Sequence, residues 1–174
     1  LNGQVSNDVR LTEDGRIVSA CLLDAKGKLQ FFVQIHRENQ DFIVQGPIDL
    51  VEELLARLDK YLIADDVELI DESMDETAYQ TVPNETRRIL DGIPRWPTEL
   101  FPGILPPEAG IEQLAISYTK GCYTGQEVIS RMKRAGKTNR HLVKLALDKP
   151  LIPTCSKLML DGKEAGIITS VASH

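Results

Sequence analysis

The sequence predicts an α+β fold, and three observations lead to this prediction. Three β-rich runs follow one another at residues 16–23, 29–36 and 41–45, and a glycine-containing turn joins the first two. An amphipathic helix with apolar residues at helical spacing comes next, at residues 47–62. A second hairpin is predicted at residues 157–171, where an Asp-Gly pair separates two short apolar runs. Strands grouped apart from helices are typical of the α+β class.

The remaining elements have weaker patterns. A short strand is predicted at residues 67–70 and a short helix at residues 86–90, which an extended, proline-rich stretch follows. One helical turn is expected at residues 107–110. Short strands are expected at residues 115–118 and 141–147, where apolar residues are frequent or alternate.

The first nine residues contain a cluster of turn-forming side chains. Ser6, Asn7 and Asp8 carry short polar groups that readily bond nearby backbone atoms, which favours a turn. The Asn7 amide and the Asp8 carboxylate could equally face a ligand. The sequence leaves both interpretations open.

The rest of the chain is organised around residues 120–127, Lys-Gly-Cys-Tyr-Thr-Gly-Gln-Glu. Thr124 followed three residues later by Glu127 has the spacing of a capping box, in which each residue bonds a backbone N–H of the other. This pattern predicts a helix over residues 125–134, with the preceding loop at its positive end.

Cys122 lies on that loop, with Lys120 two residues away. The positive end of the helix dipole and the lysine charge both favour a reactive thiolate. Gly121 and Gly125 flank the thiol, where a tight turn or a ligand close to the backbone needs a residue without Cβ. The alternative is a capped helix start with an inert, packed cysteine, and spacing alone does not decide between the two.

Length and composition indicate a globular protein of one or two domains. The 174 residues are 42% hydrophobic and 26% charged, with neither a run of about 20 apolar residues nor a signal-peptide pattern. Cys21, Cys122 and Cys155 are far apart, which argues against a disulfide framework and against a structural zinc site. We therefore expect a cytoplasmic protein that binds no metal by itself. Because the sequence starts at Leu1 and stops just after a hairpin, we also expect further chain at both ends.

Charge is unevenly distributed. The net charge is −6, yet residues 120–144 hold seven basic residues and one acidic residue, so the remainder carries −12. A basic island on an acidic protein suits a localised anionic ligand better than a long nucleic acid. A solvated helix face is the alternative, and it also stays open.

The octapeptide at residues 120–127 resembles the signature of the YgfZ family, folate-binding proteins related to the glycine-cleavage T-protein. Five other segments resemble parts of the same family in the same order. They are residues 1–9, 23–28, 88–94, 105–110 and 166–170.

The resemblance implies a T-protein-like folate-binding fold with the start of a C-terminal β-barrel. Residues 1–82 and 83–138 would form the two parts of the folate-binding region, and residues 139–174 an incomplete barrel. The implied function is an accessory role for iron–sulfur proteins or their assembly machinery, which supports tRNA modification only indirectly and involves no membrane. Cys122 would be the functional (catalytic) thiol, and tetrahydrofolate or a derivative the ligand. The implied cofactor-binding residues are Asn7, Asp8, Lys120, Gly121, Tyr123, Gly125, Gln126, Glu127 and Arg131.

Two departures from the family bear on activity. Leu90 stands where the T-protein has the Glu that meets the pterin, which argues against an active aminomethyltransferase and leaves enzyme status open. The family also has several tens more residues before Arg88, and the shortening falls around residues 79–84. An RNA-binding module is a third hypothesis, but Tyr123 is the only aromatic residue in the basic island.

Overall fold

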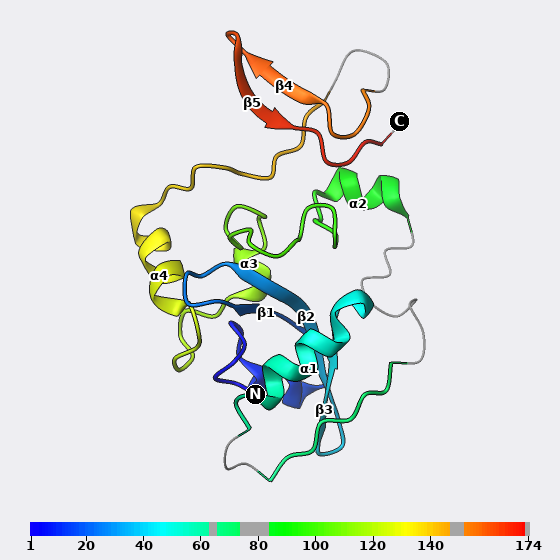
Figure 1. The fold of residues 1–174 in the computed structure, drawn as a ribbon, viewed down its shortest axis with the longest axis vertical. Helices are drawn as coiled ribbons and strands as arrows, with labels where there is room; N and C mark the ends of the chain where they lie inside the picture. Colours follow the sequence, from blue (N-terminus) through cyan, green and yellow to red (C-terminus); the bar gives the residue numbers. More distant parts are fainter. Residues whose placement is uncertain (63–65, 74–83, 147–151, 173–174) are drawn as a thin grey trace.

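The structure is a computed structural model that describes residues 1–62, 66–73, 84–146 and 152–172. It confirms the α+β class, with one three-stranded sheet and one two-stranded sheet among those residues (Figure 1). The predicted boundary between residues 82 and 83 and the shortened stretch at residues 79–84 fall almost wholly outside the described part.

The larger sheet consists of β1 (Val18–Leu23), β2 (Leu29–Glu38) and β3 (Asp41–Gln45), antiparallel and in that order. All three strands were predicted to within two residues at each end. Every residue of β1 is buried, because both faces of the sheet are covered. The strand alternation sends Cys21 and Leu23 into one apolar cluster and Ala20 and Leu22 into the other.

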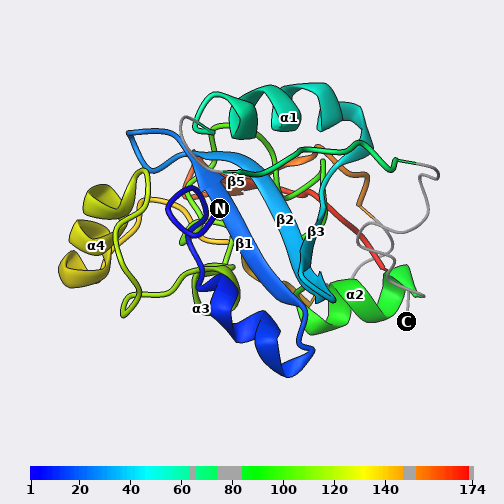
Figure 2. The ribbon, with the colours of Figure 1, turned by 90° about the horizontal axis from the view of Figure 1, so that it is seen from below.

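Different segments cover the two faces of the sheet. On one face lie the start of the chain and α1 (Val51–Asp59), which contributes Leu54. On the other face lie α3 (Glu112–Ala115), α4 (Gln126–Ala135) and the loops before them. Figure 2 shows α1 along one side of the sheet, away from α3 and α4. The predicted helix at residues 47–62 corresponds to α1 and a preceding 3₁₀ turn, Ile48–Leu50.

The predicted short helix is α2 (Glu85–Asp91), and it carries signals at both ends. The Asn84 side chain accepts a hydrogen bond from the Arg87 N–H, and Gly92 closes the helix in the left-handed conformation. The first 3₁₀ helix of the chain, Val9–Asp14, follows the polar cluster near the start of the chain, and Asp8 caps it.

Three predicted strands do not form. Residues 67–70 and 141–146 are irregular and leave Val67, Ile70, Val143 and Leu145 exposed, while Leu147 lies outside the described residues. The predicted strand at residues 115–118 is replaced by α3 and an irregular stretch. Local apolar pattern favoured strands here, but none of these stretches has a neighbouring strand to bond with among the described residues.

The second hairpin is confirmed as β4 (Lys157–Leu160) and β5 (Lys163–Ile167), although β5 is shorter and begins earlier than predicted. Asp161 and Gly162 both have positive φ angles, 49° and 77°, as a tight two-residue hairpin turn requires. In Figure 1 this hairpin lies at the end of the molecule opposite β3.

Candidate functional site

The loop before α4 exposes the Cys122 thiol and buries the side chains of Lys120 and Tyr123. Cys122 is exposed, whereas Tyr123 is only 6% exposed and packs in the apolar cluster beside α3 and α4. The other exposed cysteine, Cys155, lies on a separate loop. Cys21 is fully buried, and burial raises the pKa of its thiol to about 12. Cys21 therefore fills the core, and Cys122 is the exposed thiol of the octapeptide.

The predicted capping box is wrong. Helix α4 begins at Gln126 with Gly125 as its N-cap, and no side chain caps it. Glu127 is turned outward and pairs with Arg131 at 2.6 Å instead of reaching back to Thr124. The helix therefore starts one residue later than predicted.

Gly125 explains this start. Its φ angle is +82°, and a Cβ at this position would lie 2.6 Å from the carbonyl oxygen of Asp24 and 3.0 Å from the Cα of Gly27. The chain thus enters α4 pressed against the turn between β1 and β2, where only glycine fits. The first hairpin fixes the position of the thiol loop.

Lys120 is buried and ties the start of the chain to the thiol loop. Its side chain is nearly sealed from solvent, with the residue 6% exposed. The ammonium donates hydrogen bonds to the carbonyl oxygens of Asn2, Val5 (2.6 Å) and Asn7 (3.1 Å), and it lies 5.3 Å from the centre of the Tyr123 ring. Burial lowers the pKa of Lys120 to about 8, while the Asp8 carboxylate favours the charged form. All three ammonium hydrogens are therefore engaged by the protein.

Asn7 and Asp8 lie at the same junction. The Asn7 amide donates to the carbonyl oxygens of Ser19 (2.9 Å) and Leu114 (3.1 Å), and its side-chain oxygen accepts from the Asp8 N–H. Asp8 caps the first 3₁₀ helix and pairs with Arg10, which holds the pKa of the Asp8 carboxyl below its usual range. The family resemblance placed both residues near the site. In the structure they lie in the segment at the start of the chain whose carbonyl oxygens bond the Lys120 ammonium.

The other predicted binding residues are more open. Gly121 is exposed, with no atom within 4 Å of the position a Cβ would take. Gln126 donates its backbone N–H to the Tyr123 carbonyl at 3.2 Å, which closes the turn into α4. Glu127 and Arg131 lie on the outer face of α4, with side chains 81% and 71% exposed. A role of these residues in binding stays a prediction.

Sequence reasoning missed two parts of this region. Ser6, fully buried, donates its hydroxyl to the Ala115 carbonyl (2.5 Å) and accepts from the Cys21 N–H (2.8 Å), which joins the start of the chain to β1 and α3. Tyr118 donates to Glu112 at 2.6 Å, and its ring lies beneath the ammonium of Lys133. Burial, and then the hydrogen bond to Glu112, raise the pKa of this tyrosine. The octapeptide gives no signal for either, because Ser6, Glu112 and Tyr118 all lie outside it.

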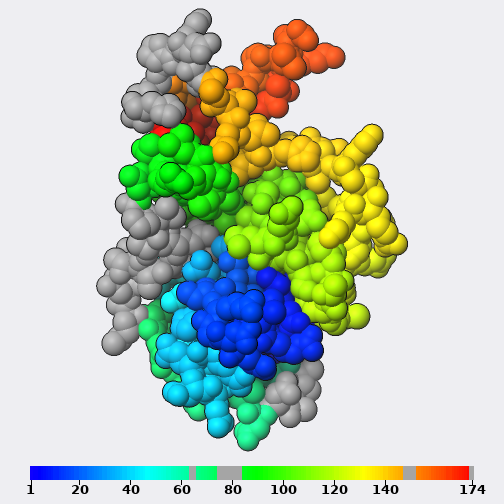
Figure 3. Space-filling view, turned by 180° about the vertical axis from the view of Figure 1, so that it is seen from behind, coloured from blue at the N-terminus to red at the C-terminus, as the bar shows by residue number. Residues whose placement is uncertain are grey.

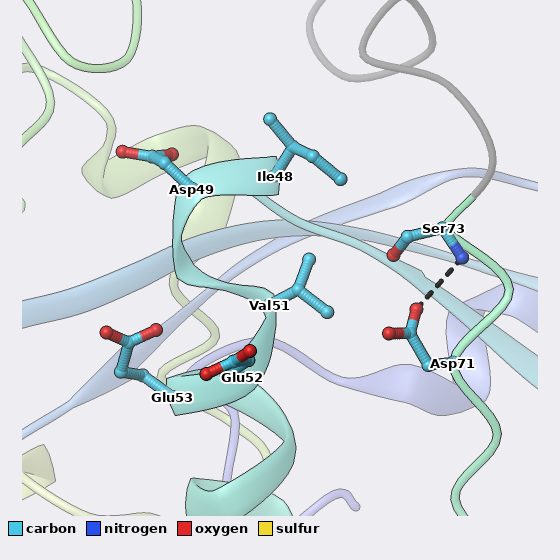
Figure 4. A pocket seen from close by; sticks show the side chains of 7 residues that line it. All are labelled: Ile48, Asp49, Val51, Glu52, Glu53, Asp71 and Ser73. Atoms are coloured by element: carbon cyan, nitrogen blue, oxygen red, sulfur yellow. Dashed lines mark hydrogen bonds between the residues drawn. The ribbon is translucent and has the colours of Figure 1, made fainter.

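A hollow of about 360 Å³ lies elsewhere, between the start of α1 and residues 71–73 (Figure 4). Four of its lining residues are acidic, and an anionic ligand would be repelled there. The lining residues are Ile48, Asp49, Val51, Glu52, Glu53, Asp71 and Ser73. Within the described ranges, no three His, Cys, Asp or Glu residues gather so that they could hold a metal ion. None of the helices described there is long and apolar enough to span a membrane.

Taken together, the fold and the thiol loop define an α+β protein that exposes a cysteine on a loop held by the buried Lys120 and Tyr123. Comparison with known proteins gives several relatives, although no protein-family model matches the chain. The chain is 28% identical over 123 residues to the tRNA-modifying protein YgfZ of Yersinia enterocolitica, which covers 67% of this chain and 37% of that protein.

Two further relatives are more similar over shorter stretches. An iron–sulfur cluster assembly factor, the mitochondrial IBA57 homolog of Cryptococcus neoformans, is 35% identical over 79 residues, covering 44% of this chain and 21% of that protein. A putative chloroplastic transferase of Arabidopsis thaliana is 38% identical over 86 residues, covering 49% of this chain and 19% of that protein. The resemblance to the YgfZ family is thus confirmed, and the chain is related to YgfZ and IBA57. It spans between about a fifth and somewhat over a third of the length of these relatives.

Proposed function

We propose that this protein is an accessory factor in iron–sulfur cluster assembly or repair, which supports tRNA modification indirectly, and that Cys122 is its functional thiol. The observation that carries the proposal is the placement of Cys122. It is exposed on a loop that a buried lysine and a tightly packed glycine hold in place. The names of the YgfZ and IBA57 relatives, which concern tRNA modification and cluster assembly, support the same role.

A single thiolate limits what the chain can do with a cluster. Iron–sulfur clusters are usually held by four thiolates, and no group of three potential ligands gathers in the described parts of the chain. We therefore propose that Cys122 supplies one ligand to a cluster whose other ligands come from a partner protein. The cluster is cargo in this scheme, and the protein presents a thiol from a rigid support. A cytoplasmic location, or an organelle such as those named for two of the relatives, is compatible with it.

A tetrahydrofolate-type ligand belongs to the proposal through the family resemblance alone. Three of the residues expected to bind it have partners within the protein: the polar groups of Lys120 and Asn7 bond backbone carbonyls, and Asp8 pairs with Arg10. The hollow beside α1 is acidic and unsuited to a folate anion. No step of the proposed function depends on folate, and a calorimetric titration with tetrahydrofolate tests that ligand independently.

The aminomethyltransferase alternative needs a carboxylate at the pterin. Leu90 occupies the corresponding position, on α2, and it is 41% exposed. We therefore expect no glycine-cleavage turnover with lipoyl carrier protein. Measurable turnover would favour the transferase alternative.

The test of the proposed function is a rescue experiment in bacteria that lack their own YgfZ. We expect the chain to restore a cluster-dependent tRNA thiomethylation, the Cys122→Ala variant to fail, and the Cys155→Ala variant to rescue as well as the unchanged chain. Cys155 is the matched control, because it is also an exposed cysteine. Full rescue by Cys122→Ala would refute the role of the thiol, and no rescue by the unchanged chain would refute the function itself.

A further inference from the structure

One strongly charged surface is unused by the proposed function. Six basic residues lie along the second half of α4 and the irregular chain after it. No acidic residue lies between positions 128 and 144. All six are exposed. This surface, the basic ridge, consists of Arg131, Lys133, Arg134, Lys137, Arg140 and Lys144.

Most of the charge on the basic ridge is not neutralised within the protein. Arg131 pairs with Glu127, Lys133 lies over the Tyr118 ring, and Lys144 donates to the Leu90 carbonyl at 2.7 Å. In residues 1–62, 66–73, 84–146 and 152–172, no carboxylate lies within ion-pair distance of the other five members of the ridge. The remainder of the sequence carries fourteen basic and twenty-six acidic residues, so the ridge is a local exception. Such a patch raises the local concentration of anionic partners.

The shape of the ridge indicates the size of the partner. The six residues follow the end of α4, the left-handed turn at Gly136 and the chain beyond it, which together form a projecting edge in Figure 3. Small anions bind in concave sites that surround them, whereas a projecting edge offers contact from one side only. The partner is therefore expected to be a macromolecule.

Neighbouring side chains favour a protein over RNA. Val143 and Leu145, 64% and 54% exposed, alternate with Lys144, and a mixture of aliphatic and cationic groups is suited to a protein surface. Recognition of single-stranded RNA commonly uses exposed aromatic rings. Here the Tyr118 ring is covered by Lys133, and Tyr123 is buried.

We infer that the basic ridge and its aliphatic neighbours, residues 131–145, dock the acidic surface of a partner protein and bring its reactive group to Cys122. Cys122 lies four residues before α4 and the ridge begins at Arg131, in the second half of that helix, so a short loop and about 8 Å of helix separate them. This distance is within reach of a bound protein or a short bound peptide. Only the delivery of a reactive group to Cys122 rests on the proposed function, because docking itself does not require a cluster.

Disulfide exchange with an acidic probe tests both parts. The probe is a short peptide of alternating Glu and Leu that ends in a cysteine activated as a thiopyridyl disulfide, and the protein carries Cys155→Ser. The Cys122 thiolate attacks the peptide sulfur, a protein–peptide disulfide forms, and 2-thiopyridone leaves with the electron pair of the broken S–S bond. We expect release of 2-thiopyridone about tenfold faster than with a Gln-for-Glu peptide, an advantage that falls with added salt.

Two matched triple variants test whether the basic ridge causes the rate advantage of the acidic peptide. Lys133→Gln/Arg134→Gln/Lys137→Gln should abolish the rate advantage of the acidic peptide. The control makes the same change in net charge on other faces, at three exposed basic residues. It is Arg16→Gln/Lys60→Gln/Lys163→Gln, and it should leave the advantage intact.

Two outcomes would overturn the inference. One is an equal loss in both triple variants, or in neither, which would mean that the ridge does not direct the peptide. The other is a tRNA probe that binds the ridge in filter binding and displaces the acidic peptide at equal charge concentration, which would assign the ridge to RNA. A failed rescue by the unchanged chain leaves the exchange result standing, so failure of the proposed function is distinguishable from failure of the docking surface.

Discussion

At the scale of single residues, Gly125 decides where α4 begins. Its positive φ angle and its approach to the Asp24 carbonyl leave no room for a side chain. Gly136, at the other end of α4, also has a positive φ angle of 64°, but no atom lies within 4 Å of the position a Cβ would take. Alanine at either position would strain the backbone, but only at Gly125 would its methyl group also collide with other atoms. Comparing the two substitutions therefore separates the cost of strain from the cost of the collision.

We expect Gly125→Ala to lower the free energy of unfolding by about 2–4 kcal/mol, since left-handed backbone strain and overpacking add. Gly136→Ala should cost only about 1 kcal/mol, because it adds the strain alone. Urea denaturation of both variants measures the difference. Equal losses would mean that the hairpin yields to the added methyl group and does not fix the thiol loop.

The same residue marks the limit of sequence reasoning at this scale. Thr124 and Glu127 have the spacing of a capping box, yet α4 has a glycine N-cap and Glu127 pairs with Arg131. Contact with the first hairpin, more than ninety residues earlier, overrides the local signal. The burial of Cys21 agrees with the apolar run that contains it, whereas the sequence left open whether Cys122 is exposed or packed.

At the scale of elements, Lys120 joins the first residues of the chain to the loop that carries the thiol. Lys120→Met keeps the aliphatic stem but leaves the carbonyl oxygens of Asn2, Val5 and Asn7 without a donor. We expect a loss of about 2–4 kcal/mol in the free energy of unfolding, since unsatisfied buried acceptors each cost about 1–3 kcal/mol and part of the region will relax.

The exposed Lys163 provides the control for this substitution. Lys163→Met should change the stability by less than about 0.5 kcal/mol. Chemical denaturation gives the stability, and proteolysis near the start of the chain reports whether this segment loosens first. A Lys120→Met variant as stable as Lys163→Met would show that the lysine is not a structural link.

Strands and helices were predictable where the signal for them, a hairpin turn, a helix cap or a periodic apolar face, lies in the neighbouring sequence. The hairpins β1–β2 and β4–β5 and helices α1 and α2 have turn residues or periodic apolar faces within the local sequence. The stretches at residues 67–70 and 141–146 show apolar residues without a pairing strand, and periodicity alone cannot supply one. The hydrogen bonds of Lys120 to the start of the chain were equally unpredictable, because the acceptors are backbone carbonyls, which every residue has.

At the scale of the whole molecule, a buried charge network connects α2 with the end of the described chain. Arg88, 2% exposed, pairs with Glu99, 3% exposed, at 3.1 Å and also with Glu85 at 2.8 Å. The Ser170 hydroxyl donates to Glu99 at 2.5 Å and accepts from Arg88 at 2.8 Å. The network spans more than eighty residues of sequence, and apart from the i,i+3 pair of Glu85 and Arg88 on α2, no local pattern joins these side chains.

Removing one partner of this network should be costly. We expect Arg88→Met to lower the free energy of unfolding by about 3–5 kcal/mol, because Glu99 is left charged and buried without its cation. Arg87→Met is the neighbouring control: Arg87 is 74% exposed and pairs with Asp91 on the surface, so its loss should cost less than about 1 kcal/mol.

A double variant shows whether the stability lost in Arg88→Met comes from the unpaired buried carboxylate of Glu99 or from general misfolding. Arg88→Met/Glu99→Gln should recover part of the lost stability, because it removes the uncompensated carboxylate. Thermal and urea unfolding of the three variants provide the comparison. No recovery in the double variant would mean that Arg88 acts through its hydrogen bonds to Ile93 and Ser170 rather than through Glu99.

The Lys120 contacts also bear on how this protein can vary over evolutionary time. The ammonium binds main-chain oxygens at positions 2, 5 and 7 and does not depend on which side chains those positions carry. Substitutions there can accumulate in different lineages without a compensating change at position 120. We therefore expect no covariation between position 120 and the side chains at positions 2, 5 and 7, although the atoms touch. Val5 and Asn7 are constrained instead by their own burial and hydrogen bonds.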